Sequence, residues 1–170
     1  MAETGGQEPL EIAPEALTSP VATALIAALN VELSARYPEP GANHFRLDPD
    51  DVASGTGAFL VARWLGRPVG CGAVRSIRDA DLMRELGPRV GELKRMYVAP
   101  DARGQGIGRT LLARLEAEAR ALGLARLVLE SGIHQPEALA LYRGAGFTDN
   151  PAYGEYVASS RTSVCLAKGL

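Results

Sequence analysis

Three glycines at alternate positions, Gly104, Gly106 and Gly108, stand where a strand-like segment ends and a leucine-rich helical pattern begins. Backbone without side chains at the first turn of a helix presents unpaired N–H groups that carry partial positive charge. Phosphate is a natural ligand for such a turn. Arg103 and Arg109 flank the glycines and are placed to add charge-assisted hydrogen bonds. We therefore predict a phosphate-binding loop; the alternative is a tight turn that uses glycine only for its geometry.

The glycine spacing disfavours two common nucleotide-binding loops. A dinucleotide fingerprint needs a glycine three residues after Gly106, where this chain has Arg109. A P-loop needs a glycine five residues before Gly108, where this chain has Arg103. The phosphate is therefore expected to belong to another kind of ligand.

The length and composition favour one globular domain around this loop. The chain has 170 residues, of which 46% are hydrophobic, enough for a single core. We expect residues 1–8 to form a disordered N-terminal tail and residues 9–170 to form the domain. The formal net charge of -2 gives no reason to expect a nucleic acid or a membrane surface as partner.

Targeting and cysteine patterns lead to two further expectations. The acidic N-terminus lacks the basic and apolar parts of a signal peptide, and no apolar run approaches the roughly 20 residues that span a bilayer. We therefore expect a cytoplasmic protein with no membrane partner. Cys71 and Cys165 have the spacing of neither a metal site nor a redox pair, so we expect both to be buried core residues.

Periodicity and turn residues predict an alternation of strands and helices. Ser19 and Pro20 begin a helix that ends before Pro38, and a long polar connection, residues 38–57, is placed to roof a substrate cleft. The predicted strands are residues 10–13, 58–64, 68–77, 90–98, 124–131, 147–150 and 161–168, and the other predicted helices are residues 107–122 and 135–146, with a short helix or loop at 79–89. This order predicts an α/β or α+β fold of three layers with a mixed sheet.

Strict alternation along the strand at residues 90–98 makes a specific prediction about its two faces. It places Glu92 and Lys94 on the same face as Met96 and Val98.

The segment R-x-x-G-x-G, from Arg103 to Gly108 and directly after "ELKRMYV", resembles the acyl-CoA pyrophosphate loop of the GNAT superfamily of N-acetyltransferases. The segments "LVLES" and "QPEALALYRGAGF" are similar to the later half of the same superfamily, so the resemblance runs from about Phe59 to the end of the chain. It implies a GNAT-like fold whose mostly antiparallel sheet contains a splayed strand pair that binds acyl-CoA. It also implies acetyl-CoA as co-substrate and requires no metal.

The resemblance assigns the cofactor-binding residues. The main chain of Met96, Tyr97 and Val98 would lie along the pantetheine arm, and Gln135 stands where many relatives have an asparagine that contacts this arm. The pyrophosphate would be held by backbone amides and by the first arginine of the motif; these residues are Arg103, Gly104, Gln105, Gly106, Ile107, Gly108 and Arg109.

The resemblance also assigns three catalytic candidates. Tyr142 would protonate the leaving thiolate; otherwise it is a core tyrosine that packs with Phe147. Either Glu92 or Glu130 would accept the proton of the attacking amine, and Glu92 is slightly favoured. The alternatives are an ion pair with Lys94 or an arginine for Glu92, and a cap on the following helix for Glu130.

The acceptor side is less sharply defined. The C-terminal region resembles a branch assigned to small-molecule amines, and we expect His44, Arg46, Arg75 and Tyr153 to rim the acceptor cleft. The basic residues suggest an amino-acid-like acceptor with a carboxylate or phosphate, or else they are solvated surface residues. The expected function is transfer of acetyl from acetyl-CoA to such an amine in a ternary complex. The rival functions are protein lysine or N-terminal acetylation, and non-catalytic acyl-CoA sensing. The final strand suggests a homodimer, as in many relatives.

Overall fold

The computed structural model describes residues 9–170; the expected tail, residues 1–8, lies outside this range. The strands are β1 (Leu10–Pro14), β2 (Gly57–Trp64), β3 (Arg67–Ser76), β4 (Val90–Val98), β5 (Arg126–Gly132), β6 (Thr148–Asn150) and β7 (Ser163–Gly169). The α-helices are α1 (Pro20–Arg36), α2 (Ala80–Leu86), α3 (Ile107–Ala121) and α4 (Pro136–Gly144). The predicted order of strands and helices is confirmed, and the segment left as helix or loop forms α2.

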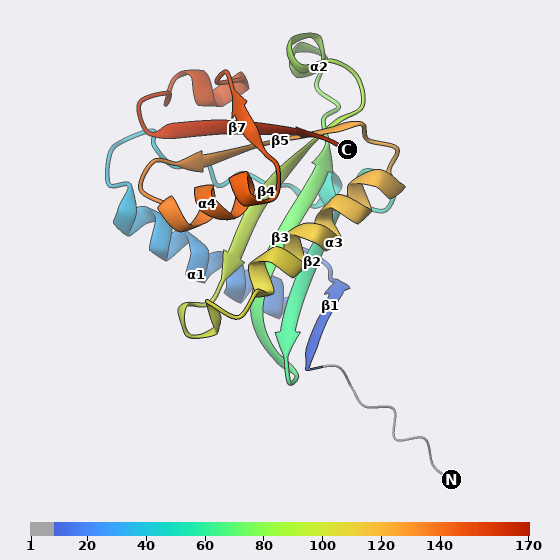
Figure 1. Ribbon diagram of the computed structural model, residues 1–170, viewed down its shortest axis with the longest axis vertical. Helices are drawn as coiled ribbons and strands as arrows, with labels where there is room; N and C mark the ends of the chain where they lie inside the picture. Colours follow the sequence, from blue (N-terminus) through green and yellow to red (C-terminus); the bar gives the residue numbers. More distant parts are fainter. Residues whose placement is uncertain (1–8) are drawn as a thin grey trace.

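The seven strands form one mixed sheet in the order β1-β2-β3-β4-β5-β7-β6. All neighbouring pairs are antiparallel except the parallel pair β4 and β5. Helices α3 and α4 cover one face and α1 lies on the other (Figure 1). The main core, between the sheet and α3 and α4, includes Leu60, Leu93, Leu111, Leu115, Leu129 and Phe147. The predicted three-layer fold is therefore confirmed.

Local signals in the sequence fix several element ends. The Ser19 side chain accepts a hydrogen bond of 3.0 Å from the Ala22 amide and caps α1. The β2–β3 hairpin turns through Leu65 and Gly66, whose φ angles of 49° and 82° are both positive. Both cysteines are buried, as expected. Within residues 9–170, no helix combines the length and the apolar character needed to cross a membrane.

A bulge in β4 overturns the predicted alternation of its side chains. Arg95 has a φ angle of 57°, and the pairing with β3 changes register at this point. As a result Met96 packs into the same core cluster as Leu93, on the α3 face of the sheet. Glu92 and Lys94 instead line a cavity on the opposite face. The expectation that Met96 points the same way as Glu92 and Lys94 was wrong, because one bulged residue reverses the faces that follow it.

Strands β4 and β5 separate after a short paired region. Residues Val90 to Leu93 pair with Arg126 to Leu129, but β4 continues to Val98 and β5 to Gly132 without further pairing between them. Figure 1 shows the two strands diverging. Among the described residues, the separation leaves one edge of β4 without a partner strand. Side chains of α1 and of the loop after α1 line the gap between the two strands.

Gly132, the last residue of β5, lies directly against Tyr37 at the end of α1. A Cβ atom at position 132 would lie 1.8 Å from the Tyr37 hydroxyl oxygen and 2.1 Å from Cζ. We expect Gly132→Ala to lower the free energy of unfolding by about 1–3 kcal/mol, the usual cost of overpacking. Thermal or denaturant unfolding measures this. Gly169→Ala is the control, because a Cβ atom there meets nothing within 4 Å; equal stability of the two variants would contradict the contact.

Candidate functional site

Three adjoining cavities follow the gap between β4 and β5. The groove, of about 280 Å³, lies at the N-terminus of α3. The central cavity, of about 80 Å³, shares the lining residues Leu29, Met96 and Gln135 with the groove. The outer cavity, of about 430 Å³, shares Lys94 and Tyr156 with the central cavity. Together they make a path from the glycine loop, between the separated strands, to the C-terminal loops.

The groove has the backbone features of an anion site. Gly104 and Gly106 have φ angles of 82° and 80°, and Gly106 is the N-cap of α3. Gly108 faces the groove, where a Cβ atom would meet only the side chains of Leu141 at 3.4 Å and Val98 at 3.7 Å. Gly106 and Gly108 therefore place no side chain of their own between the first amides of α3 and the groove, which lets a phosphate approach these amides.

Of the two arginines that flank the glycines, Arg103 is bound to other parts of the protein and Arg109 is exposed. The Arg103 guanidinium donates to both Glu32 carboxylate oxygens, at 2.9 and 3.0 Å, and to the Val98 carbonyl at 2.8 Å. Arg103 thus joins α1 to the end of β4 in this structure. Arg109 lines the groove and is exposed, whereas Gln105 is exposed but not among the lining residues in the described part of the chain. The predicted strand residues Met96, Tyr97 and Val98 also line the groove.

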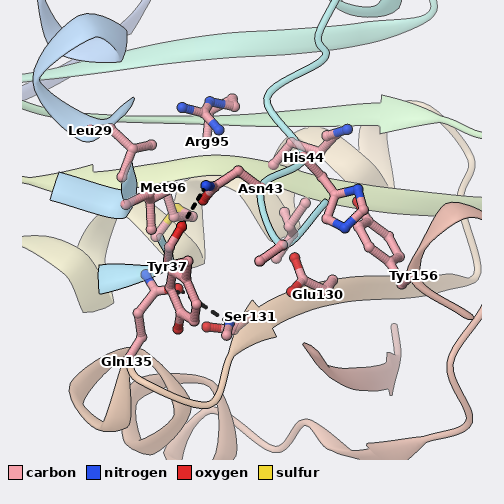
Figure 2. Close-up of a pocket in the computed structure, with 15 residues that line it drawn as sticks. Leu29, Tyr37, Asn43, His44, Arg95, Met96, Glu130, Ser131, Gln135 and Tyr156 are labelled. Atoms are coloured by element: carbon pink, nitrogen blue, oxygen red, sulfur yellow. Dashed lines mark hydrogen bonds between the residues drawn. The ribbon is translucent and has the colours of Figure 1, made fainter. Parts of the chain in front are cut away.

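Glu130 projects from β5 into the central cavity, near Asn43 and His44 of the loop after α1 and near Tyr156 (Figure 2). Burial raises the pKa of the Glu130 carboxyl to about 7, and the like charge of Glu92 adds to the rise. The hydroxyl of Ser163 and the ammonium of Lys94 oppose it. A carboxyl with such a pKa can both take up and release a proton near neutral pH.

A small hydrogen-bond network fixes the wall of the central cavity opposite the loop. The Tyr37 hydroxyl accepts from the His134 amide at 2.9 Å and donates to Gln135 Oε1 at 3.4 Å. The same oxygen of Gln135 accepts from the Gly132 amide at 3.2 Å. The amide group of Gln135 thus lies where the central cavity meets the groove.

Glu92 is buried between the sheet and the outer cavity, with 1% of its surface exposed. Arg75 Nε donates to Oε1 at 2.8 Å, and the Tyr153 hydroxyl donates to Oε2 at 2.6 Å. Both carboxylate oxygens are therefore occupied, which matches the ion-pair alternative. Glu130 has more freedom to accept a proton from a ligand.

The four predicted acceptor residues divide between two cavities. His44 lines the central cavity, where its Nε2 lies 2.8 Å from Ser159 Oγ. Arg46, Arg75 and Tyr153 line the outer cavity. The outer cavity also contains carboxylates from the loop after α1, from α2 and its cap, from β4 and from the C-terminal loop; they are Asp48, Asp51, Asp79, Asp81, Glu85, Glu92 and Glu155.

Comparison with known proteins identifies the family of this fold and path. Residues 22–147 match the model of the acetyltransferase (GNAT) family. An IAA acetyltransferase of Azospirillum brasilense is 43% identical over 145 residues, which make up 85% of this chain and 88% of the relative. The chain belongs to the GNAT family of acetyltransferases. It is therefore an acyl-CoA-dependent acyltransferase.

Other relatives of this GNAT acetyltransferase agree in fold and in general activity. A putative acyl-CoA N-acyltransferase from Klebsiella pneumoniae is 35% identical with a TM-score of 0.75, over 95% of this chain and 97% of that one. An aminoglycoside N(6')-acetyltransferase type 1 of Stenotrophomonas maltophilia is 36% identical over 99 residues, which cover 58% of this chain and 64% of the relative. These relatives support N-acetylation in general and leave the acceptor unspecified.

Tyr142 lies in the main core of this GNAT domain and, in the described part of the chain, is not among the residues that line the three cavities. It is 6% exposed and packs edge-on against Phe147, with ring centroids 5.9 Å apart. Burial raises the pKa of its hydroxyl above the usual value, and the charge of Glu130 contributes to this rise. The hydroxyl therefore stays protonated around neutral pH and is available as a hydrogen-bond donor.

Tyr37 and Lys94 are among the residues that line the path and were not predicted as site residues. Tyr37 is the C-cap of α1, and nothing in its local sequence indicates that it contacts the end of β5. Lys94 was placed on the face of Glu92, but its position between the central and outer cavities depends on the bulge that follows it. The long polar loop at residues 38–57, which was expected to roof a substrate cleft, contributes Asn43 and His44 to the lining of the central cavity.

Proposed function

We propose that this GNAT enzyme transfers acetyl from acetyl-CoA to a primary amine of a small molecule, with Glu130 as general base. The observation that carries the proposal is the position of Glu130. Its carboxyl faces the small central cavity, which adjoins the groove on one side and the larger outer cavity on the other. A base in this place can reach an amine that enters from the outer cavity.

The groove fits the phosphate and pantetheine parts of coenzyme A. The bare turn at Gly106 and Gly108 offers the helix amides to the pyrophosphate. The open edge of β4 from Met96 to Val98 offers backbone groups to the amides of the pantetheine arm, as a neighbouring strand would. Gln135 adds a side-chain amide where the groove and the central cavity meet. The thioester, when bound, supplies the acyl group at the central cavity.

In this proposal two residues divide the proton transfers, Glu130 in the central cavity and Tyr142 in the core. An ammonium has no lone pair with which to attack, so the carboxylate of Glu130 takes its proton, directly or through a water molecule. The nitrogen forms a bond to the thioester carbonyl carbon, and the carbon–sulfur bond breaks. Tyr142 donates a hydrogen bond and then a proton to the sulfur. Protein acetylation at a lysine or N-terminus is the remaining enzymatic alternative.

An amine panel with acetyl-CoA tests this proposal. Release of free thiol and the mass of the product are followed for primary amines of different charge and length. We expect amine-dependent release of one CoA for each N-acetyl product. Tight binding of CoA with no turnover on any amine would instead support a sensor role, and acetylated peptides without small-molecule products would support a protein acceptor.

Tyr142→Phe tests the acid role without disturbing the core. Phenylalanine keeps the ring that packs on Phe147 and removes only the hydroxyl. We expect kcat to fall about tenfold or more, within the range typical of general acids, while the melting temperature and the KM for acetyl-CoA change little. Steady-state kinetics and thermal unfolding measure these quantities; wild-type turnover in a folded variant would remove Tyr142 from the mechanism.

A further inference from the structure

The outer cavity is the largest of the three, and it adjoins the central cavity that Glu130 lines. Seven carboxylates and three basic side chains line it, a formal excess of four negative charges among the lining residues. Two of these carboxylates pair with arginines outside the lining, Asp51 with Arg78 at 3.5 Å and Asp81 with Arg84 at 3.0 Å. This balance differs from the sequence-based expectation of basic residues that bind a carboxylate or phosphate. The charge of the ligand that the cavity can bind depends on which of these side chains already have a partner of opposite charge.

Each basic group of the outer cavity already has a carboxylate partner from the same lining. Arg46 contacts Asp48 at 3.0 Å. Arg75 contacts Glu92 at 2.8 Å. Lys94 contacts Glu155 at 4.0 Å. An acceptor carboxylate would therefore have to compete with carboxylates that belong to the protein.

Of the three carboxylates contributed by α2 and its cap, Asp81 contacts Arg84 at 3.0 Å, and the other two, Asp79 and Glu85, are less fully matched. Asp79 accepts a hydrogen bond of 2.9 Å from the Leu82 amide, and Glu85 accepts one of 3.4 Å from the Gly154 amide. Within residues 9–170, neither carboxylate is within 4.0 Å of a basic side chain. Their charges are stabilised by backbone amides and face a cavity large enough for a small polar molecule.

We infer that the acceptor is a small molecule with at least two cationic amines, one acetylated beside Glu130 and another held by Asp79 and Glu85 across the outer cavity. This inference rests on the proposed acetyl transfer and adds the substrate class. Lys94, at the junction with the central cavity, lies near the amine that reacts, which must be neutral there. The distant amine keeps its charge and lies among the carboxylates. Diamines and polyamines fit this pattern, and amino acids do not.

Three acceptors of similar length test the inference, because they differ mainly in the distant group: 1,5-diaminopentane carries an ammonium, pentylamine a methyl and 5-aminopentanoate a carboxylate. We expect kcat/KM with acetyl-CoA to be highest for the diamine, by about tenfold over pentylamine, and lowest for the carboxylate. Calorimetry of the same three amines on the protein saturated with CoA gives the order of affinity independently of turnover.

The double variant Asp79→Asn/Glu85→Gln assigns the preference to these carboxylates. Both replacements keep an oxygen for the backbone amides, and asparagine is as good an N-cap as aspartate. We expect the advantage of the diamine over pentylamine, taken as the ratio of the two kcat/KM values in the same variant, to fall about tenfold. The control is Glu11→Gln/Asp149→Asn, which removes two exposed charges outside the cavity.

The outcomes separate this inference from the function on which it rests. If amines are acetylated but the diamine has no advantage, or keeps its full advantage in the double variant, the substrate class is wrong and the acetyl transfer stands. If no amine of the wider panel promotes release of CoA, the proposed function itself fails. If the diamine leads and the double variant removes its advantage, both are supported.

Discussion

Glu130→Gln should lower kcat about 100-fold, with the affinity for CoA unchanged. Glutamine has nearly the shape of glutamate but cannot take a proton from the attacking amine, and a general base typically contributes 10²- to 10⁴-fold. The side chain lines the central cavity and lies outside the groove, so binding of CoA should not depend on its charge. Steady-state kinetics at saturating amine and calorimetry with CoA measure the two effects.

The pH dependence of kcat tests more directly whether Glu130 is the base. A base works only when it is deprotonated, so the wild-type kcat should rise with pH through the pKa of Glu130, about 7, and then level off. In Glu130→Gln this acid-side limb should disappear. The measurement is kcat between about pH 5.5 and 9 at saturating amine, where it reports groups in the ternary complex.

Glu92→Gln is the matched control for the choice between the two glutamates. The negative charge of Glu92 raises the pKa of Glu130, so its removal should move the limb to lower pH without abolishing it. If Glu92→Gln loses the limb and Glu130→Gln keeps it, the base is Glu92 despite its contacts with Arg75 and Tyr153. If both variants keep full activity across the range, neither carboxylate is a general base.

Gly108→Leu should weaken CoA binding by tenfold or more while the fold remains intact. Gly108 lies in the first turn of α3 with helical geometry, and the space beyond it belongs to the groove. Leucine favours a helix more than glycine does by roughly 0.8 kcal/mol, so the helix should not suffer. Its side chain, however, would occupy the approach to the amides of the turn. Calorimetry with CoA and the KM for acetyl-CoA measure the loss.

Two further variants make this loss specific. Gly108→Ala adds a methyl group with its nearest contact at 3.4 Å, so its effect on CoA binding should be much smaller. Gly144→Leu adds the same side chain to α4, where a Cβ atom meets nothing within 4 Å. Wild-type affinity in a folded Gly108→Leu protein would show that CoA phosphates do not approach this turn.

The sequence by itself determined the order of the elements and the chemistry of the loop. Caps, prolines and apolar spacing are local signals, so the limits of α1 could be read from Ser19, Pro20 and Pro38. The three glycines indicated a phosphate loop for a similarly local reason, since bare amides at a helix start depend only on neighbouring residues. The resemblance around Arg103–Gly108 and Tyr142 supplied the family, which the comparisons confirm.

The tertiary structure decided which charged groups are free to act. In the sequence both Glu92 and Glu130 lie on strands next to apolar residues, and Glu92 was slightly favoured as the base. Only packing brought Arg75 and Tyr153 onto Glu92 and left Glu130 facing a cavity. In the same way Arg46 and Arg75 suggested an anionic acceptor until the fold placed a carboxylate beside each.

The bulge at Arg95 shows why the sequence determined the order of the elements but not the direction of every side chain. Side-chain direction along a strand follows from alternation only while the ladder is regular, and one residue with a positive φ angle reverses it. No local pattern in "ELKRMYV" predicts that break, because it is stabilised by contacts from elsewhere in the chain. The Arg95 guanidinium bonds to Asn30 of α1 and stacks 5.1 Å from the ring centre of Phe45. Asn30 and Phe45, which contact the bulged residue, are 65 and 50 positions away from it in the sequence. The bulge lies between Met96, which lines the groove, and Lys94, which lines the outer cavity.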